Sequence, residues 1–93
     1  MPVFHVYILF SCKCDRYYIG SAKDVTIRLL RHNAGAVKST KNCIPWEIKY
    51  YQVFETRTEA LKREPALKRK KSRVHLEWLI NNFKEWTGGH API

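Results

Sequence analysis

The sequence predicts an α+β fold, in which a small three-stranded sheet of antiparallel type is flanked by helices in the order β-β-α-β-α-α. Residues 3–10 are apolar, β-branched or aromatic almost without interruption, and residues 46–54 alternate between apolar and other side chains. Residues 24–33 and 72–83 carry apolar side chains at helical spacing. One short chain thus contains apolar residues at the spacing of strands and at the spacing of helices, which favours a sheet with helices packed on it.

The first two strands are expected to form a hairpin. The unbroken apolar run of residues 3–10 is typical of a strand covered on both faces, which places it in the middle of the sheet. Residues 11–16 are short and polar, and residues 17–20 return to a β-type composition. Gly20 then allows the chain to turn or a neighbour to approach closely.

A helix of about three turns follows the hairpin. Asp24 is a good N-cap, and Gly35 is well placed to end the helix. Residues 36–45 are small, polar and basic, which predicts an exposed loop. Lys38 and Lys41 in this loop are candidate phosphate contacts.

The remaining elements are one strand and two helices. Residues 46–54 predict a strand with one mainly apolar face. Thr56 or Thr58 can cap the next helix, in which Pro65 predicts a kink or a restart because it lacks an amide donor. Ser72 can cap the last helix. The apolar stripe of that helix faces the core or a partner and consists of Leu76, Leu79, Ile80 and Phe83, flanked by Trp78 and Trp86.

Composition favours one folded, basic domain. We expect that domain to span residues 1–86 of the 93, with a flexible tail at residues 87–93. Hydrophobic residues make up 45% of the chain, which is too apolar for a disordered protein. Lys and Arg number 17 against eight Asp and Glu, so the net charge is +9. Such an excess favours a polyanionic partner such as nucleic acid, and a solvated basic surface is the alternative.

Neither a signal peptide nor a membrane span is expected. Pro2 and His5 interrupt the apolar N-terminal stretch, and no small-residue cleavage site follows it. The three cysteines, Cys12, Cys14 and Cys43, are an odd number and lack paired CxxC spacing. We therefore expect reduced thiols in a cytoplasmic protein, and a Cys12–Cys14 metal site completed by a histidine is the weaker alternative.

Five side chains are candidates for one catalytic pocket: Tyr7, Tyr18, Arg28, His32 and Glu64. Arg28 and His32 are four residues apart and share one helix face. Tyr7 and Tyr18 lie on the paired strands and can be near neighbours. Glu64 adds a carboxylate from a later helix. Two phenols, a guanidinium, an imidazole and a carboxylate in a basic protein are the groups that hydrolysis of a phosphodiester requires.

Roles follow from the chemistry of these groups. Glu64 alone can anchor Mg²⁺ or Mn²⁺, because Mg²⁺ takes one or two carboxylates and keeps several waters. The ion would stabilise the leaving oxygen. Tyr7 or Tyr18 is a candidate general base for the attacking water, since nearby positive charge favours the phenolate. Arg28 would neutralise charge that grows on the phosphoryl oxygens.

The same residues also lie in motifs that resemble those of a known protein superfamily. The motif HVY at residues 5–7 and the motif YIG at residues 18–20 resemble the paired signature of the GIY-YIG nuclease superfamily, with His5 in place of the first glycine. The segment DVTIRLLRHN at residues 24–33 resembles that superfamily's arginine helix, and TEALKRE at residues 58–64 resembles its metal-binding helix.

The resemblance covers residues 3–80 and implies a metal-dependent DNA endonuclease. It implies that Tyr7 and Tyr18 are active-site tyrosines, that Arg28 and His32 lie on the phosphate side, and that Glu64 is the metal ligand.

Other features resemble the small stand-alone bacterial members of the superfamily, namely Trp46 and the pair Leu67-Lys68. Pro65 directly after the metal ligand departs from the pattern, as does Leu76, where several members carry an asparagine. The chain leaves no room for an added recognition domain, so specificity is expected to come from a protein partner, to come from DNA structure, or to be absent. We expect a monomer or a weak homodimer.

The densest positive charge is a second candidate nucleic-acid contact. It comprises Lys68, Arg69, Lys70, Lys71 and Arg73. These side chains would follow a nucleic-acid backbone and make binding salt-dependent, and a solvated helix end is an equal alternative.

Each site residue also has an ordinary structural explanation. The tyrosines can be sheet aromatics, Arg28 and His32 can form a solvated helix face, and Glu64 can merely pair with Lys68 at i+4. For the whole chain, the main alternative to a nuclease is a module of the same fold that binds DNA or RNA without cutting it. A third class is an interaction protein that uses the apolar stripe of the last helix.

Overall fold

The computed structural model describes residues 3–70 and 72–82. In chain order the elements are β1 (Phe4–Ser11), β2 (Arg16–Ala22), α1 (Val25–Asn33), the 3₁₀ turn η1 (Lys41–Cys43), β3 (Glu47–Phe54), α2 (Arg57–Lys70) and α3 (Arg73–Asn81). The strands form one antiparallel sheet in the order β2-β1-β3. The predicted α+β class and element order are confirmed. The predicted tail at residues 87–93 lies outside the described residues.

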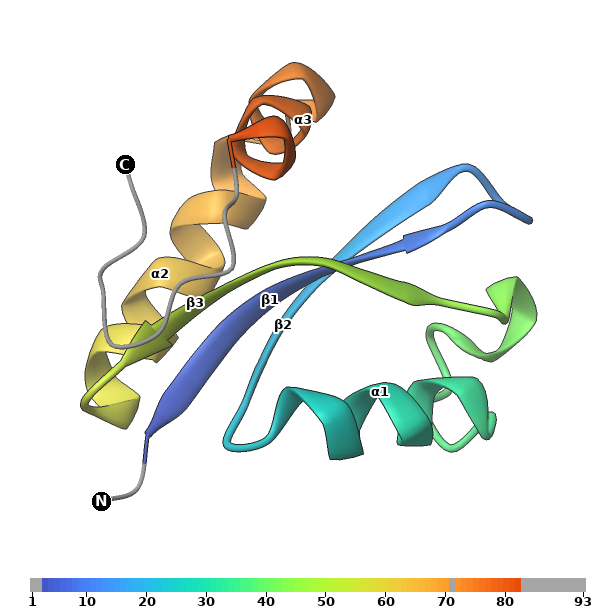
Figure 1. Ribbon diagram of the computed structural model, residues 1–93, viewed down its shortest axis with the longest axis horizontal. Coiled ribbons are helices and arrows are strands. Elements are labelled where there is room, and N and C mark those ends of the chain that lie inside the picture. Colours follow the sequence, from blue (N-terminus) through green and yellow to red (C-terminus); the bar gives the residue numbers. More distant parts are fainter. Residues whose placement is uncertain (1–2, 71, 83–93) are drawn as a thin grey trace.

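Helices cover both faces of the sheet, with α1 on one face and α2 and α3 on the other (Figure 1). The central strand β1 supplies buried side chains to both layers. Val6 and Ile8 pack on the α2 and α3 side, whereas Tyr7 and Leu9 pack on the α1 side. The unbroken apolar run of β1 is therefore explained, because both of its faces are buried. Every helix within the described ranges is too short or too polar to span a bilayer.

An irregularity in β3 changes which face its side chains take. Ile8 pairs with Tyr50 but Leu9 pairs with Ile48, so Lys49 is an extra residue in the register. Tyr50 consequently packs on the α2 and α3 side, and Ile48 packs on the α1 side. The prediction of one apolar face along this strand is wrong, because a bulge reverses the alternation.

The helix caps follow the sequence closely. Asp24 and Ser72 cap α1 and α3 as predicted. Thr56, not Thr58, caps α2. Its Oγ1 accepts a hydrogen bond from the Glu59 N–H at 3.2 Å and donates to the Glu59 carboxylate at 3.0 Å. The Thr56 hydroxyl thus satisfies a free amide of the first turn and fixes where α2 begins.

Helix α2 passes through Pro65 without the predicted restart. The missing amide of Pro65 would have bonded to the Leu61 carbonyl, one turn earlier. Both residues are exposed, so water can satisfy that carbonyl. Leu67, just after the proline, is 1% exposed in the core and anchors the second half of the helix.

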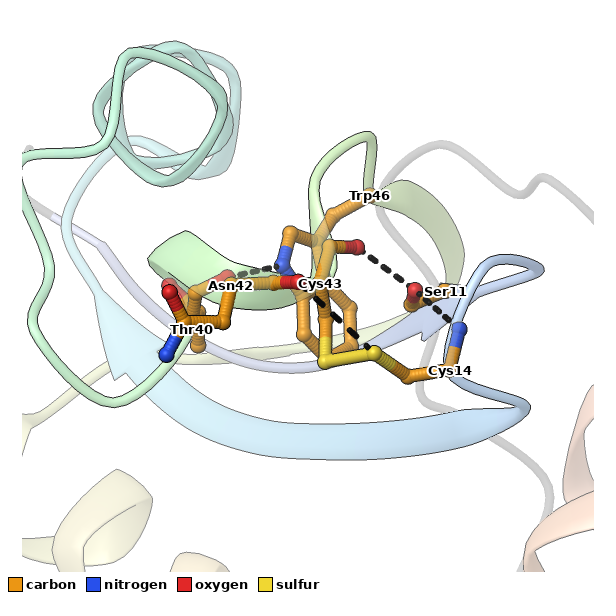
Figure 2. The surroundings of a disulfide bond; sticks show 6 residues. All are labelled: Ser11, Cys14, Thr40, Asn42, Cys43 and Trp46. Carbon is orange, nitrogen blue, oxygen red and sulfur yellow. Dashed lines mark hydrogen bonds between the residues drawn. A yellow bond between two sulfur atoms is a disulfide. The ribbon is translucent and has the colours of Figure 1, made fainter.

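A disulfide joins Cys14 in the β1–β2 turn to Cys43 at the end of η1, and Cys12 is a free, exposed thiol (Figure 2). The prediction of three reduced thiols is therefore wrong for two of them, because the fold brings residues 29 positions apart together. The bond also uses the thiol that the alternative Cys12–Cys14 metal site needed. Within the described ranges, no group of three His, Cys, Asp or Glu residues is arranged to hold a metal ion.

Reducing the Cys14–Cys43 bond is expected to lower the free energy of unfolding by about 2–4 kcal/mol, because the cross-link restricts the unfolded chain. Guanidinium titrations with and without a thiol reductant measure this difference. Cys14→Ser should unfold like the reduced protein, and Cys12→Ser should unfold like the oxidised wild type. A wild type that is indifferent to reductant would contradict the bond.

Candidate active site

Tyr7 lies across Gly20, its partner on the neighbouring strand. A Cβ added at Gly20 would lie 2.5 Å from the Tyr7 Oη and 2.7 Å from its Cζ, which no real contact allows. Gly20 is therefore needed for close approach and not for a turn. With this space the Tyr7 ring lies beside Tyr18, at 6.4 Å between ring centroids.

Tyr7 also begins a buried chain of hydrogen bonds. Its Oη lies 3.0 Å from His32 Nε2, and His32 Nδ1 lies 2.8 Å from Thr40 Oγ1. The Thr40 hydroxyl donates to the Val37 carbonyl at 3.3 Å. In the tautomer that fits this donation, the Thr40 oxygen accepts a hydrogen bond from a protonated His32 Nδ1. A neutral His32 then accepts at Nε2, and the Tyr7 hydroxyl donates to it.

The environment holds both rings in their neutral forms. Burial lowers the pKa of His32, and the charge of Arg28 lowers it further. Burial raises the pKa of Tyr7 well above its usual range, with a further rise from Tyr18 and a smaller opposing effect of Arg28. The structure thus differs from the expectation that neighbouring charge favours a tyrosine phenolate, because for Tyr7 the loss of hydration outweighs the guanidinium.

The loop of residues 36–45, which was predicted to be exposed, is partly buried next to His32. Thr40 is 1% and Cys43 is 6% exposed. The Trp46 indole N–H donates to the Thr40 carbonyl at 2.9 Å. The Asn33 side chain accepts from the Trp46 N–H at 2.7 Å and donates to the Trp46 carbonyl at 3.1 Å. Figure 2 shows the Trp46–Thr40 bond and the disulfide. Together with the Asn33 bonds, they fix Thr40 in its place beside His32.

Glu64 reaches strand β2 from α2. The Ser21 hydroxyl donates to Glu64 Oε1 at 2.6 Å, and Lys68 Nζ donates to Oε2 at 2.7 Å. Burial raises the pKa of Glu64, but the hydrogen bonds from Lys68 and Ser21 and the charge of Lys68 together lower it below its usual value. The Glu64–Lys68 pair that i+4 spacing indicated is present.

The structure brings the predicted site residues to the two sides of β2. Tyr18 and His32 have ring centroids 4.9 Å apart on the α1 side. Arg28 lies one turn before His32 and influences the pKa of Tyr7, and so does Glu64 from the α2 side. Two contributors, Ser21 and Thr40, were missed. For Ser21 the available signal was its position directly after the YIG motif, and for Thr40 the sequence offers none that we recognise.

A divalent ion fits this site only with help from its substrate. Glu64 offers one carboxylate, and Mg²⁺ or Mn²⁺ would need water and phosphate oxygens to complete its coordination. The Lys68 ammonium lies 2.7 Å from Glu64 Oε2, so it would have to move away before an ion could bind that oxygen. The donor set therefore fits an ion that arrives with a phosphate.

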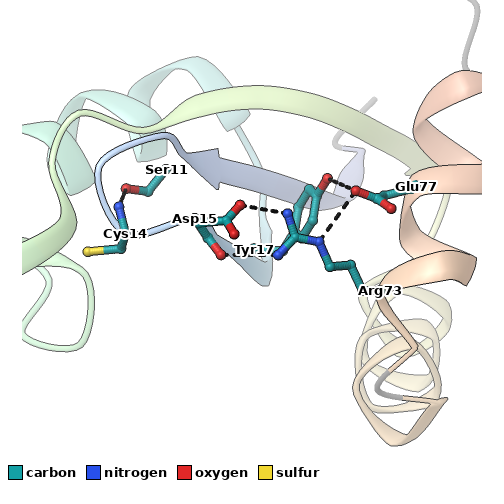
Figure 3. Close-up of polar contacts among 6 residues, drawn as sticks. All are labelled: Ser11, Cys14, Asp15, Tyr17, Arg73 and Glu77. Atoms are coloured by element: carbon teal, nitrogen blue, oxygen red, sulfur yellow. Dashed lines mark hydrogen bonds and ion pairs between the residues drawn. The ribbon is translucent and has the colours of Figure 1, made fainter.

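Arg73 has a structural role that the sequence did not indicate. Its Nη2 contacts Asp15 Oδ1 at 2.6 Å in the hairpin turn, and its Nε contacts Glu77 at 3.4 Å (Figure 3). Its guanidinium also lies over the Tyr17 ring, 5.3 Å from the centroid. These contacts tie α3 to the β1–β2 turn. Two carboxylates thus partly neutralise the charge that was predicted to bind phosphate.

The other predicted nucleic-acid contacts remain at the surface. Lys38, Lys41 and Arg69 are exposed, so they stay available to a phosphate. The side chain of Lys70 and the whole of Lys71 lie outside the described residues.

Comparison with known proteins agrees with this geometry. Residues 3–78 match the GIY-YIG catalytic domain. The chain is 41% identical over 69 residues to a UPF0213 protein of Staphylococcus saprophyticus, covering 73% of this chain and 83% of that protein. A UPF0213 protein of Listeria welshimeri is 38% identical over 82 residues, covering 87% and 91%. The solution NMR structure of a UPF0213 protein from Bacillus halodurans is similar with a TM-score of 0.52 and 31% identity, covering 85% of this chain and 83% of that chain.

Stability should depend on pH through His32. Because its pKa is lowered in the folded protein, the unfolded chain binds more protons, so the free energy of unfolding falls as the pH falls through about 6.5. Urea titrations at about pH 7.5 and about pH 5.5 measure the difference. His32→Gln should reduce it, and His5→Gln, which keeps His32, should not. An unchanged dependence in His32→Gln would contradict the assignment.

Proposed function

The chain belongs to the GIY-YIG catalytic domain family, and we propose on this basis that it is a metal-dependent DNA endonuclease that hydrolyses phosphodiester bonds. The observation that carries the proposal is the buried chain from Tyr7 through His32 to Thr40, placed beside Arg28 and within the electrostatic influence of Glu64.

The first step is removal of a proton from the attacking water. The water oxygen bonds to phosphorus while the bond from phosphorus to the leaving oxygen breaks, and the leaving oxygen keeps the electron pair. The water proton passes to the Tyr7 oxygen, and the Tyr7 proton passes to His32 Nε2 over the 3.0 Å hydrogen bond. His32 becomes an imidazolium whose Nδ1–H still donates to Thr40. Tyr7 does not have to ionise beforehand, which agrees with its raised pKa.

The phosphate side of the site is formed by Arg28 and Glu64. The Arg28 guanidinium neutralises charge on the phosphoryl oxygens. Glu64, oriented by the Ser21 hydroxyl, would hold the divalent ion, which when bound supplies stabilisation of the negative leaving oxygen. Lys68 can move from Glu64 to a phosphate oxygen, since its side chain is 50% exposed.

The proposal also covers the source of substrate specificity, the oligomeric state and the cellular compartment. A protein partner or the structure of the DNA supplies specificity, and the protein acts as a monomer or a weak homodimer. We place the activity in the cytoplasm because the relatives described above are bacterial and bacterial DNA lies there, although a disulfide such as Cys14–Cys43 is uncommon in that compartment.

A second candidate function is a module that binds nucleic acid without cutting it. The observation in its favour is that both carboxylate oxygens of Glu64 already have partners, Ser21 and Lys68. In such a protein the Glu64–Lys68 pair would persist, and Arg28 would serve binding alone.

A cleavage assay on labelled single-stranded, duplex and branched DNA with Mg²⁺ or Mn²⁺ tests the nuclease. Glu64→Gln and Tyr7→Phe are each expected to lower the rate by about 100-fold or more while DNA binding is kept, because they remove the ion's ligand and the proton relay. Glu55→Gln, which changes an exposed carboxylate, is the matched control and should cut normally. A wild type that binds these DNAs at low salt yet cuts none would contradict the nuclease and favour the binding module.

A further inference from the structure

The outer face of α1 exposes large apolar side chains next to the candidate site. Ile27 is 58% exposed and Leu30 is 65% exposed, and their i, i+3 spacing puts them on one side of the helix. Arg28 precedes Leu30 on the same helix and borders the site. Exposing two large apolar side chains next to each other has an unfavourable hydration free energy, which a contact would remove. This face is therefore suited to a contact.

The charge around these side chains is positive and unpaired. Lys23 and Arg31 are exposed, and neither forms an ion pair with any residue that the structure describes. No acidic residue lies in the first turn of α1. Asp24, which precedes the helix, accepts from the Ile27 N–H at 3.0 Å and so serves as its cap. An anion is therefore the favoured partner.

This face is continuous with the site. A depression of about 320 Å³ is lined by Ala22, Lys23, Asp24, Ile27, Arg28 and Arg31. A second depression of about 260 Å³ shares Ala22, Lys23 and Arg28 with it and also includes Ser21 and Arg57. Ser21 is the residue that hydrogen-bonds Glu64. One ligand can thus contact Ile27, Arg28 and the surroundings of Glu64 together.

We propose that the α1 outer face, formed by Lys23, Ile27, Leu30 and Arg31, contacts DNA beside the phosphate to be cleaved. The inference rests on the proposed function for its choice of DNA. Lys23 and Arg31 bind phosphates, and Ile27 and Leu30 pack against base or sugar edges. Apolar side chains reach those edges where base steps are opened or kinked. The substrate class is therefore DNA with a distorted or unpaired step, in preference to regular duplex.

DNA explains this surface better than the other occupants. A second copy of a chain with net charge +9 would bring like charges together around Lys23 and Arg31. By contrast, two cations of the predicted basic run, Lys68 and Arg73, are paired with carboxylates. Lys23 and Arg31 on the α1 side form no such pair among the described residues, and neither does Arg57 of α2, which lines the second depression.

Binding of the full chain to fluorescently labelled DNA tests the proposal, in a Glu64→Gln background so that no cutting intervenes. The double variant Ile27→Gln/Leu30→Gln is expected to bind branched DNA about tenfold more weakly, with the salt dependence unchanged. Arg31→Gln should weaken binding and reduce the slope of log affinity against log salt by about one. Val74→Gln, 77% exposed on α3, and Lys62→Gln, exposed on α2, are matched controls and should bind normally.

The possible results separate this surface from the proposed activity. If the α1 variants bind like the controls, the surface is overturned whether or not wild type cuts DNA. If they bind weakly and wild type cuts nothing, the surface stands as a binding site and the nuclease fails. If the double variant binds DNA normally but loses self-association in sedimentation, the face joins two copies of the chain and the proposal is overturned.

Discussion

The hydrogen bond between Tyr7 and His32 is the interaction on which the candidate site depends. A buried hydroxyl or imidazole without a partner costs free energy, so the two groups must meet, and Thr40 must satisfy the second ring nitrogen. This requirement fixes the distance of α1 from the sheet. It also fixes the position of the loop that carries Thr40. Trp46 and the Cys14–Cys43 disulfide hold that loop from its other side. Stability and chemistry therefore use the same bonds.

The position of β2 at the edge of the sheet explains how two layers can form one site. Tyr18 faces α1 and packs against His32, whereas Ser21 reaches Glu64 on α2. Helices that do not pack on each other thus both contribute, because the edge strand lies between them. Part of the charge that the sequence highlighted serves structure instead, since Lys68 pairs with Glu64 and Arg73 pairs with Asp15.

The sequence predicted local features and missed those that depend on long-range geometry. The spacing of hydrophobic residues and capping side chains such as Asp24 and Ser72 predicted the helices and strands, since these signals act within a few residues. The bulge at Lys49 and the partner of Cys14 were not predictable, because they arise only when strand β3 and the η1 turn meet the hairpin. The candidate site was predicted from its motif, and the buried Thr40 was not, since a threonine in a polar loop resembles a surface residue.

The tautomer of His32 tests the proton relay most directly. In protein with ¹⁵N-labelled histidine, NMR spectra near neutral pH distinguish the two ring nitrogens, and His32→Gln assigns the signals. The expected result is a neutral ring that is protonated at Nδ1 and unprotonated at Nε2, because the Nδ1–H donates a hydrogen bond to Thr40 Oγ1 and the Tyr7 hydroxyl donates to Nε2. A ring protonated at Nε2, or an imidazolium, could not accept the Tyr7 proton and would contradict the relay.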